Sequence, residues 1–196
     1  MQLQHVNVKL FVDSQPEPDL EPLIPVFHRW IQGQILEDLL LDVADYRHVQ
    51  AGPGVVLIGH QGNYSVDQTG GRLGIRYNRK AALDGSNLDR LQQACRAALT
   101  ACQRLEMEPR LEGKFRFNGQ EIEVFINDRL LAPNRDSTRE AALPDLRAFF
   151  DKLFGGAEYS LSDPLSSGGD PRKLFAVFVK AARSFPVETL LANLDC

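Results

Sequence analysis

The sequence is short of the features that mark secreted or metal-stabilised proteins. It holds only three cysteines, Cys95, Cys102 and Cys196, and no two of them are closely spaced. An odd number of cysteines without such spacing is typical neither of a disulfide framework nor of a zinc site. We therefore expect reduced cysteines and, because reducing conditions prevail there, a cytoplasmic location.

Long apolar runs and an excess of basic residues are also missing. No segment approaches the roughly 20 apolar residues that a membrane-spanning helix needs, and the N-terminus lacks the basic and apolar regions of a signal peptide. The formal net charge is −4, which gives no overall support to nucleic-acid or anionic-membrane binding. We expect a soluble protein that binds neither.

Motifs for cofactors and covalent catalysis are absent as well. The chain has no G-x-G-x-x-G and no G-K-[ST] phosphate loop, and its histidines show neither H-x-H nor H-x-x-x-H spacing. The GHQGN stretch around His60 invites comparison with the G-x-S-x-G nucleophile elbow, but Gln61 occupies the position of the nucleophile. The sequence therefore predicts no bound cofactor, no metal ion and no serine or cysteine nucleophile.

The composition is that of an ordinary globular protein. Hydrophobic residues make up 43% of the chain and charged residues 24%, and a chain of this length buries about 70% of its unfolded surface. We expect one compact domain over residues 1–196, with 83–87 (LDGSN) as the candidate point of division.

Hydrophobic periodicity predicts strands and helices in alternation. The expected strands are 6–12, 55–58, 63–67, 72–78, 157–161 and 173–181, and the expected helices are 23–31, 86–106, 137–155 and 184–194. Segment 35–50 fits a helix and a strand equally, and DPLSSGGDPR at 163–172 reads as a flexible loop. Cys95 and Cys102 lie on the apolar stripe of 86–106, which favours core packing over reactivity.

The dipeptide Asn118-Gly119 predicts a two-residue hairpin turn. Pairing across this turn would place Phe115 opposite Ile122 and group the charged residues on the other face. Hairpins between helices indicate an α+β fold with a mixed, largely antiparallel sheet, helices packed mainly on one face, and repeated units of one helix and two strands.

The stretch GRLGIRYNRK places several cations on one face of a strand. Alternation puts Arg72, Arg76, Asn78 and Lys80 on the side opposite the apolar residues. Neighbouring cations repel one another unless negative charge compensates them. Asp67, across the expected hairpin from Arg72, could neutralise one and a bound anion another. The alternative is a solvated outer face with acidic counterions.

Polar residues also gather where two predicted strands end. Asn127, Asp128 and Arg129 follow one strand and are well placed to meet a ligand, although Asn and Asp equally serve to turn the chain. His60 ends the apolar strand VVLI between Gly59 and Gly62. An imidazole there could act as a general acid or base, and the alternative is a structural histidine.

These features support three functional hypotheses. The first is a binding or adaptor protein that recognises an anionic small molecule or an acidic protein surface. Its ligand-binding residues would be Arg72, Arg76, Arg79, Lys80, Asn127 and Arg129. The second is a small-molecule enzyme in which His60 transfers a proton and Asp67 or Asp128 orients it. The third is a structural protein that forms homo-oligomers through a sheet edge or the final helix.

Overall fold

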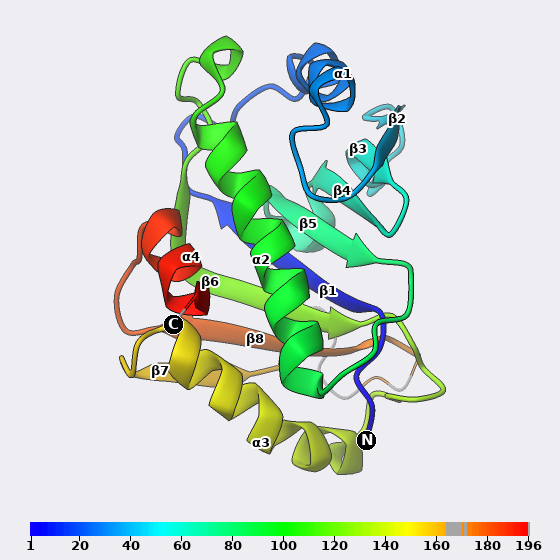
Figure 1. Cartoon of the computed structure of the whole chain (residues 1–196), viewed down its shortest axis with the longest axis vertical. Coiled ribbons are helices and arrows are strands. Elements are labelled where there is room, and N and C mark those ends of the chain that lie inside the picture. The colour runs from blue at the N-terminus through cyan, green and yellow to red at the C-terminus, as the bar shows by residue number, and fades with distance from the viewer. Residues whose placement is uncertain (164–169, 171, 196) are drawn as a thin grey trace.

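The computed structural model describes residues 1–163, 170 and 172–195. The fold is α+β, as expected, with one open eight-stranded sheet and four α-helices packed against it (Figure 1). The helices are α1 (Leu23–Gly33), α2 (Asn87–Glu106), α3 (Asp136–Leu153) and α4 (Val187–Asp195). The strands are β1 (Val6–Val12), β2 (Leu40–Tyr46), β3 (Gly54–Gly59), β4 (Gly62–Asp67), β5 (Gly74–Arg79), β6 (Phe117–Ile126), β7 (Tyr159–Ser162) and β8 (Phe175–Ala181). Short 3-10 helices, η1 (Thr69–Gly71) and η2 (Pro109–Leu111), complete the described elements.

The strand order is β2-β3-β4-β5-β1-β6-β8-β7, and every pairing among the described strands is antiparallel. The first strand of the chain thus lies inside the sheet and joins β5 on one side to β6 on the other. Strands from before and after the 83–87 segment therefore share one sheet. The two sheet edges are β2 and β7.

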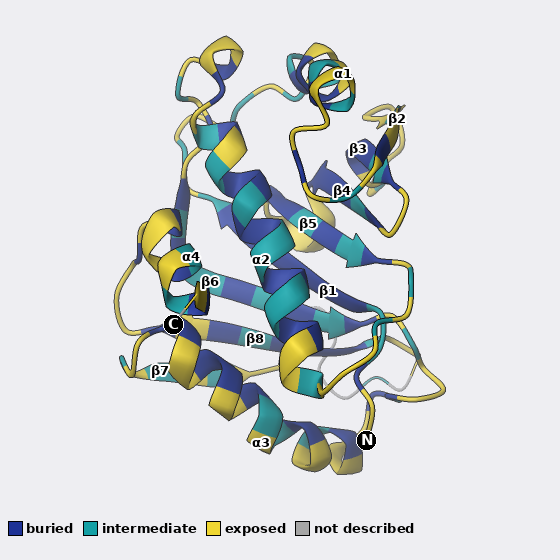
Figure 2. Ribbon diagram, in the orientation of Figure 1, coloured by how far each residue is buried: buried dark blue, intermediate teal, exposed yellow. Residues whose placement is uncertain are grey.

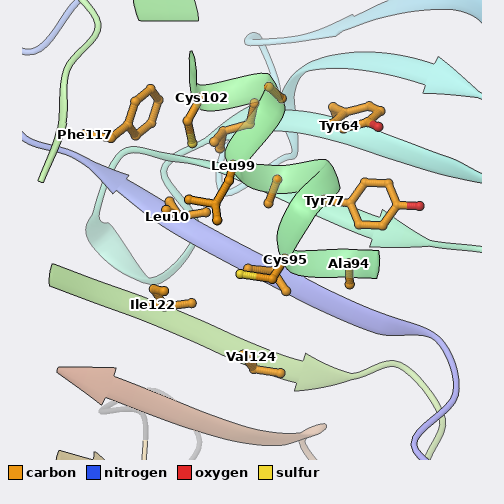
Figure 3. Packing of buried hydrophobic residues seen from close by; sticks show 14 of the residues in the cluster. Leu10, Tyr64, Tyr77, Ala94, Cys95, Leu99, Cys102, Phe117, Ile122 and Val124 are labelled. Carbon is orange, nitrogen blue, oxygen red and sulfur yellow. The ribbon is translucent and has the colours of Figure 1, made fainter. Parts of the chain in front are cut away.

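One face of the sheet carries the hydrophobic core. Helix α2 begins with a capping box in which Ser86 and Asp89 satisfy each other's backbone N–H groups. Its apolar stripe faces β1 and β5, and Figure 3 shows Leu99 beside Leu10. Both described cysteines are free and buried, and burial raises the pKa of Cys95 to about 12. The prediction that they serve core packing is confirmed.

The opposite face of the sheet differs from the core face in what packs against it and in which residues it carries. The buried apolar residues of all four α-helices belong to one apolar cluster, which excludes the buried Phe11, Val56 and Ala176. These three belong to the other side of the sheet, which no α-helix of the described residues crosses (Figure 2). We call it the helix-free face. No helix of the described residues is long and apolar enough to cross a membrane.

Three local expectations required a decision or a correction. The ambiguous segment 35–50 contains strand β2. The hairpin at Asn118-Gly119 is wrong, because both residues lie inside the continuous strand β6, and Ile122 pairs with Leu10 and Val179 instead of Phe115. A long strand with a neighbour on each side outweighs the local turn preference. The expected repeat of one helix followed by two strands is also wrong, because α2 is followed by the single strand β6.

The glycine of that dipeptide has a different use. Gly119 has a φ of +55°, and a Cβ atom there would lie 2.2 Å from the carbonyl oxygen of Phe185. The backbone carbonyl of Asn118 accepts a hydrogen bond from the N–H of Phe185 at 3.0 Å. The Asn-Gly pair thus allows β6 to pack closely against Phe185, in the segment that precedes α4. Most of the loop expected at 163–172, namely 164–169 and 171, lies outside the described residues.

Candidate functional site

The turn that carries His60 is held by its own neighbours. The Asp38 carboxylate accepts hydrogen bonds of 2.9 Å from the N–H groups of Gln61 and Gly62. A Cβ atom at Gly59 would lie 2.4 Å from that carboxylate, and one at Gly62 would lie 2.5 Å from the ring of Tyr77. The two glycines that flank His60 are thus required by packing within the protein.

Two of the predicted ligand-binding cations take part in the same turn. Arg79 donates to the Gln61 side chain and to the carbonyl of Ala81, both at 2.9 Å. Lys80 donates to the carbonyl of Gly59 at 2.6 Å. The His60 side chain is exposed, and its backbone N–H donates to the carbonyl of Leu39. Arg79 and Lys80 therefore have structural partners at the turn.

The residues predicted for acid–base chemistry lie in different places. Asp67 is at the far end of β4 from His60, and five residues of extended strand separate Gly62 from Asp67 by about 17 Å. Asp128 follows β6, which is three strand positions from β4 and hence about 14 Å away. Proton transfer requires hydrogen-bond contact or one bridging water, so the fold offers no geometric support for that combination.

The segment after β6 forms a self-contained turn. Asp128 accepts hydrogen bonds from the N–H groups of Leu130 at 3.0 Å and Leu131 at 2.9 Å. The N–H of Asn127 donates to the carbonyl of His5 at 3.1 Å, and Arg129 is exposed. Asp128 thus makes the kind of Asx-turn that Asp commonly provides.

A charged cluster lies on the helix-free face, and we name it the Lys9 cluster after its central residue; its members are Lys9, Asp67, Arg76 and Glu123. The Lys9 ammonium contacts the Asp67 carboxylate at 3.0 Å, and both side chains are fully buried. It also donates to the carbonyls of Thr69 at 2.8 Å and Arg72 at 2.9 Å. The pair therefore anchors the β4–β5 connection onto this face.

The two carboxylates of the Lys9 cluster respond oppositely to their surroundings. Burial would by itself raise the pKa of Asp67, but the charges of Arg76 and Lys9 outweigh it and hold that pKa below its ordinary value. Burial raises the pKa of Glu123, and the same two cations offset only part of this effect. Burial also lowers the pKa of Lys9, against the influence of Asp67.

Arg76 occupies the solvent side of the Lys9 cluster. Its guanidinium lies 3.4 Å from Asp67 and 5.0 Å from the ring centre of Phe125. Its Nε atom is buried and has no hydrogen-bond partner among the described residues, and the same holds for Oδ1 of Asn63 on the next strand. Arg76 pairs with Ser65 and Asn63 with Asn78, so Arg76 and Asn63 are diagonal neighbours about 7–8 Å apart between Cα atoms.

Arg72 is not opposite Asp67, which corrects the expected register. Strand β5 begins at Gly74, and Gly74 is the residue that pairs with Asp67. The connection is longer than the QTGG turn alone, and it carries Arg72 over the central strands β1 and β6 of the helix-free face. There the guanidinium forms an ion pair with Glu121 and lies 3.9 Å from the ring centre of Phe11.

Sequence reasoning missed the importance of Lys9, Glu123 and Asn63. The alternation in VNVKLFV had placed Lys9 on the polar side of its strand, but solvent was expected there. The sequence did contain one signal for this cluster: a lysine, an arginine and two acidic residues all occupy the polar sides of their strands. Their meeting depends on the order β4-β5-β1-β6, which periodicity does not reveal.

Comparison of the chain with protein-family models, with curated proteins and with solved structures finds no match. The site must therefore be interpreted from its own chemistry.

Proposed function

We propose that this protein is a binding protein that recognises a carboxylate on the helix-free face of its sheet, at Arg76. The carboxylate would belong to a small molecule or to an acidic side chain of a partner protein. The observation that carries the proposal is the buried Nε of Arg76, which lacks a partner among the described residues. A guanidinium presents Nε–H and a neighbouring N–H as a fork that matches a carboxylate.

The surroundings of Arg76 favour such a role. Asp67 engages one terminal nitrogen and the Phe125 ring lies against the guanidinium, so the side chain is held in place before a ligand arrives. Pre-organisation of this kind reduces the entropic cost of binding. The buried Oδ1 of Asn63, which has no hydrogen-bond partner in the described part of the chain, adds an acceptor nearby. Such an acceptor suits a ligand that carries an N–H or O–H group beside its carboxylate.

The charge balance of the Lys9 cluster also permits an anion. Lys9 and Arg76 are both cations, whereas Glu123 has a pKa raised by burial and is more readily protonated than an exposed glutamate. Protonation of Glu123 leaves two cations against Asp67. We therefore expect carboxylate affinity to increase as the pH falls through the pKa of Glu123, until the ligand itself becomes protonated.

The test is an NMR titration that follows the Nε–H resonance of Arg76 and the amides of β4 and β5. The probes are citrate, inorganic phosphate and a hexaglutamate peptide, each added at constant ionic strength. We expect a saturating shift of the Arg76 signal with citrate or the peptide. Tighter binding of citrate would identify a small-molecule site, and tighter binding of the peptide would identify a protein-recognition site.

The variants Arg76→Gln and Arg104→Gln form a matched pair. Arg104 is exposed on α2, away from the helix-free face. Loss of a charge-assisted fork should weaken binding by at least about tenfold in Arg76→Gln, and Arg104→Gln should bind as the wild type does. Equal effects of the two variants, or shifts that never saturate with any probe, would refute the proposal.

A further inference from the structure

The edge strand β2 and the residues that flank it carry an unusual density of exposed apolar side chains. Ten large apolar residues of the described chain are exposed, and half of them lie between residues 35 and 49: Ile35, Leu39, Leu41, Tyr46 and Val49. Leu39 and Leu41 retain 55% and 50% of their accessible surface. An exposed edge strand with apolar residues is a template for pairing with another chain.

The backbone of β2 is only partly covered on its outer side. The side chain of Gln34 bonds both the N–H and the C=O of Leu40. A bulge follows between Leu40 and Asp42, and the N–H of Val43 donates to the Asp42 carboxylate at 2.8 Å. Alternation in an antiparallel ladder then turns the backbone groups of Asp45 outward as well. An added strand could pair with the carbonyl of Val43 and with the backbone groups of Asp45.

The edge is acidic as well as apolar. Residues 35–46 contain four carboxylates and no lysine or arginine. Asp38 holds the β3–β4 turn and Asp45 pairs with Arg47, whereas Glu37 and Asp42 form no ion pair within the described residues. Near the end of β2, Tyr46 and Val49 help to line a hollow of about 400 Å³, which could receive a side chain of an added strand.

We infer that β2 accepts an extended segment of a partner protein in which basic and apolar residues alternate. Main-chain hydrogen bonds would supply affinity, and the exposed leucines together with the carboxylates of Glu37 and Asp42 would select the sequence. A second copy of the chain fits less well, because two acidic strands would bring like charges together. The inference is independent of carboxylate binding at Arg76, which lies on β5.

The probe is a fluorescently labelled peptide of alternating lysine and valine, with a glutamate–valine peptide of equal length as the comparison. Fluorescence anisotropy at physiological salt gives the affinity, and amide hydrogen exchange locates the contact. We expect binding of the lysine peptide only, with slower exchange at Asp45. The Asp42→Asn variant, which retains the side-chain acceptor for Val43, should bind about fivefold more weakly.

The matched control is Asp84→Asn, which removes the same charge from an exposed loop before α2. Equal weakening by both variants would show general electrostatic attraction and overturn the inference. The Leu41→Ser variant should also weaken binding without lowering the melting temperature. Sedimentation tests the competing occupant: a dimer that Asp42→Asn strengthens would assign the edge to a second copy and overturn the inference too.

Discussion

The two faces of the sheet are built from the same strands but are stabilised differently. In β1, Val6, Val8 and Leu10 join the apolar cluster beneath the helices, whereas Asn7 and Lys9 are equally buried on the helix-free face. Burial of apolar surface is non-directional, so the helix-covered face depends on shape and volume. A buried charge is tolerated only with a specific partner. The helix-free face therefore depends on pairing, and its stability should depend on pH.

The largest expected effect comes from removing a partner on the helix-free face. Asp67→Ala leaves the Lys9 ammonium with backbone carbonyls alone, which should lower the free energy of unfolding by about 4 kcal/mol at pH 7. Because the folded pKa of Asp67 lies below its ordinary value, this stabilisation is present above about pH 4 and disappears as the pH falls through the folded pKa. Urea unfolding from pH 7 to pH 3 measures it.

A difference between wild type and Asp67→Ala that stays constant over this pH range would contradict the ion-pair explanation. A second variant, Lys9→Met combined with Asp67→Leu, removes both charges together. It should recover much of the lost stability, because a buried pair can often be replaced by apolar side chains at little cost.

A cavity on the helix-covered face should have a smaller effect that does not depend on pH. Leu99 of α2 is fully buried beside Leu10. Leu99→Ala should lower the free energy of unfolding by about 3 kcal/mol through lost transfer energy and the cavity that remains. The same urea series provides the measurement, and a loss that varied with pH as in Asp67→Ala would remove the contrast between the two faces.

The smallest expected effect has the opposite sign. The raised pKa of Glu123 means that its ionised form is disfavoured in the folded state, a cost that is present above the folded pKa and is relieved as the pH falls. Glu123→Gln should therefore stabilise the protein at pH 7 by roughly 1 kcal/mol or less and leave it unchanged at low pH. Destabilisation at pH 7 would show that Glu123 is a required ionic partner.

The sequence predicted much of the secondary structure correctly. Three local signals are confirmed by the structure: the capping box at Ser86, the apolar stripe through Cys95 and the alternation in β1. The Asn118-Gly119 hairpin failed because β6 gains more from two long neighbours than a two-residue turn offers. Segment 35–50 remained ambiguous since only its position beside β3 makes it a strand.

The candidate site was harder to predict from the sequence. Arg76 was correctly placed on the polar side of its strand, but Arg79 and Lys80 were expected to meet a ligand and instead hold the turn at His60. Asp67, the ionic partner of Lys9, lies 58 positions away in the chain, and Arg76, which also contacts Asp67, belongs to a third strand. Periodicity cannot predict such partners, because it indicates only which side of a strand a residue occupies.

The sequence by itself determined the α+β class, the core stripe of α2 and the polar side of β1 and β5, because periodicity and capping act between near neighbours. Only the tertiary structure decided the strand order, the burial of Lys9 against Asp67 and the exposure of β2 at an edge. Those outcomes depend on which distant strands pair, and pairing is settled by the burial of the whole sheet.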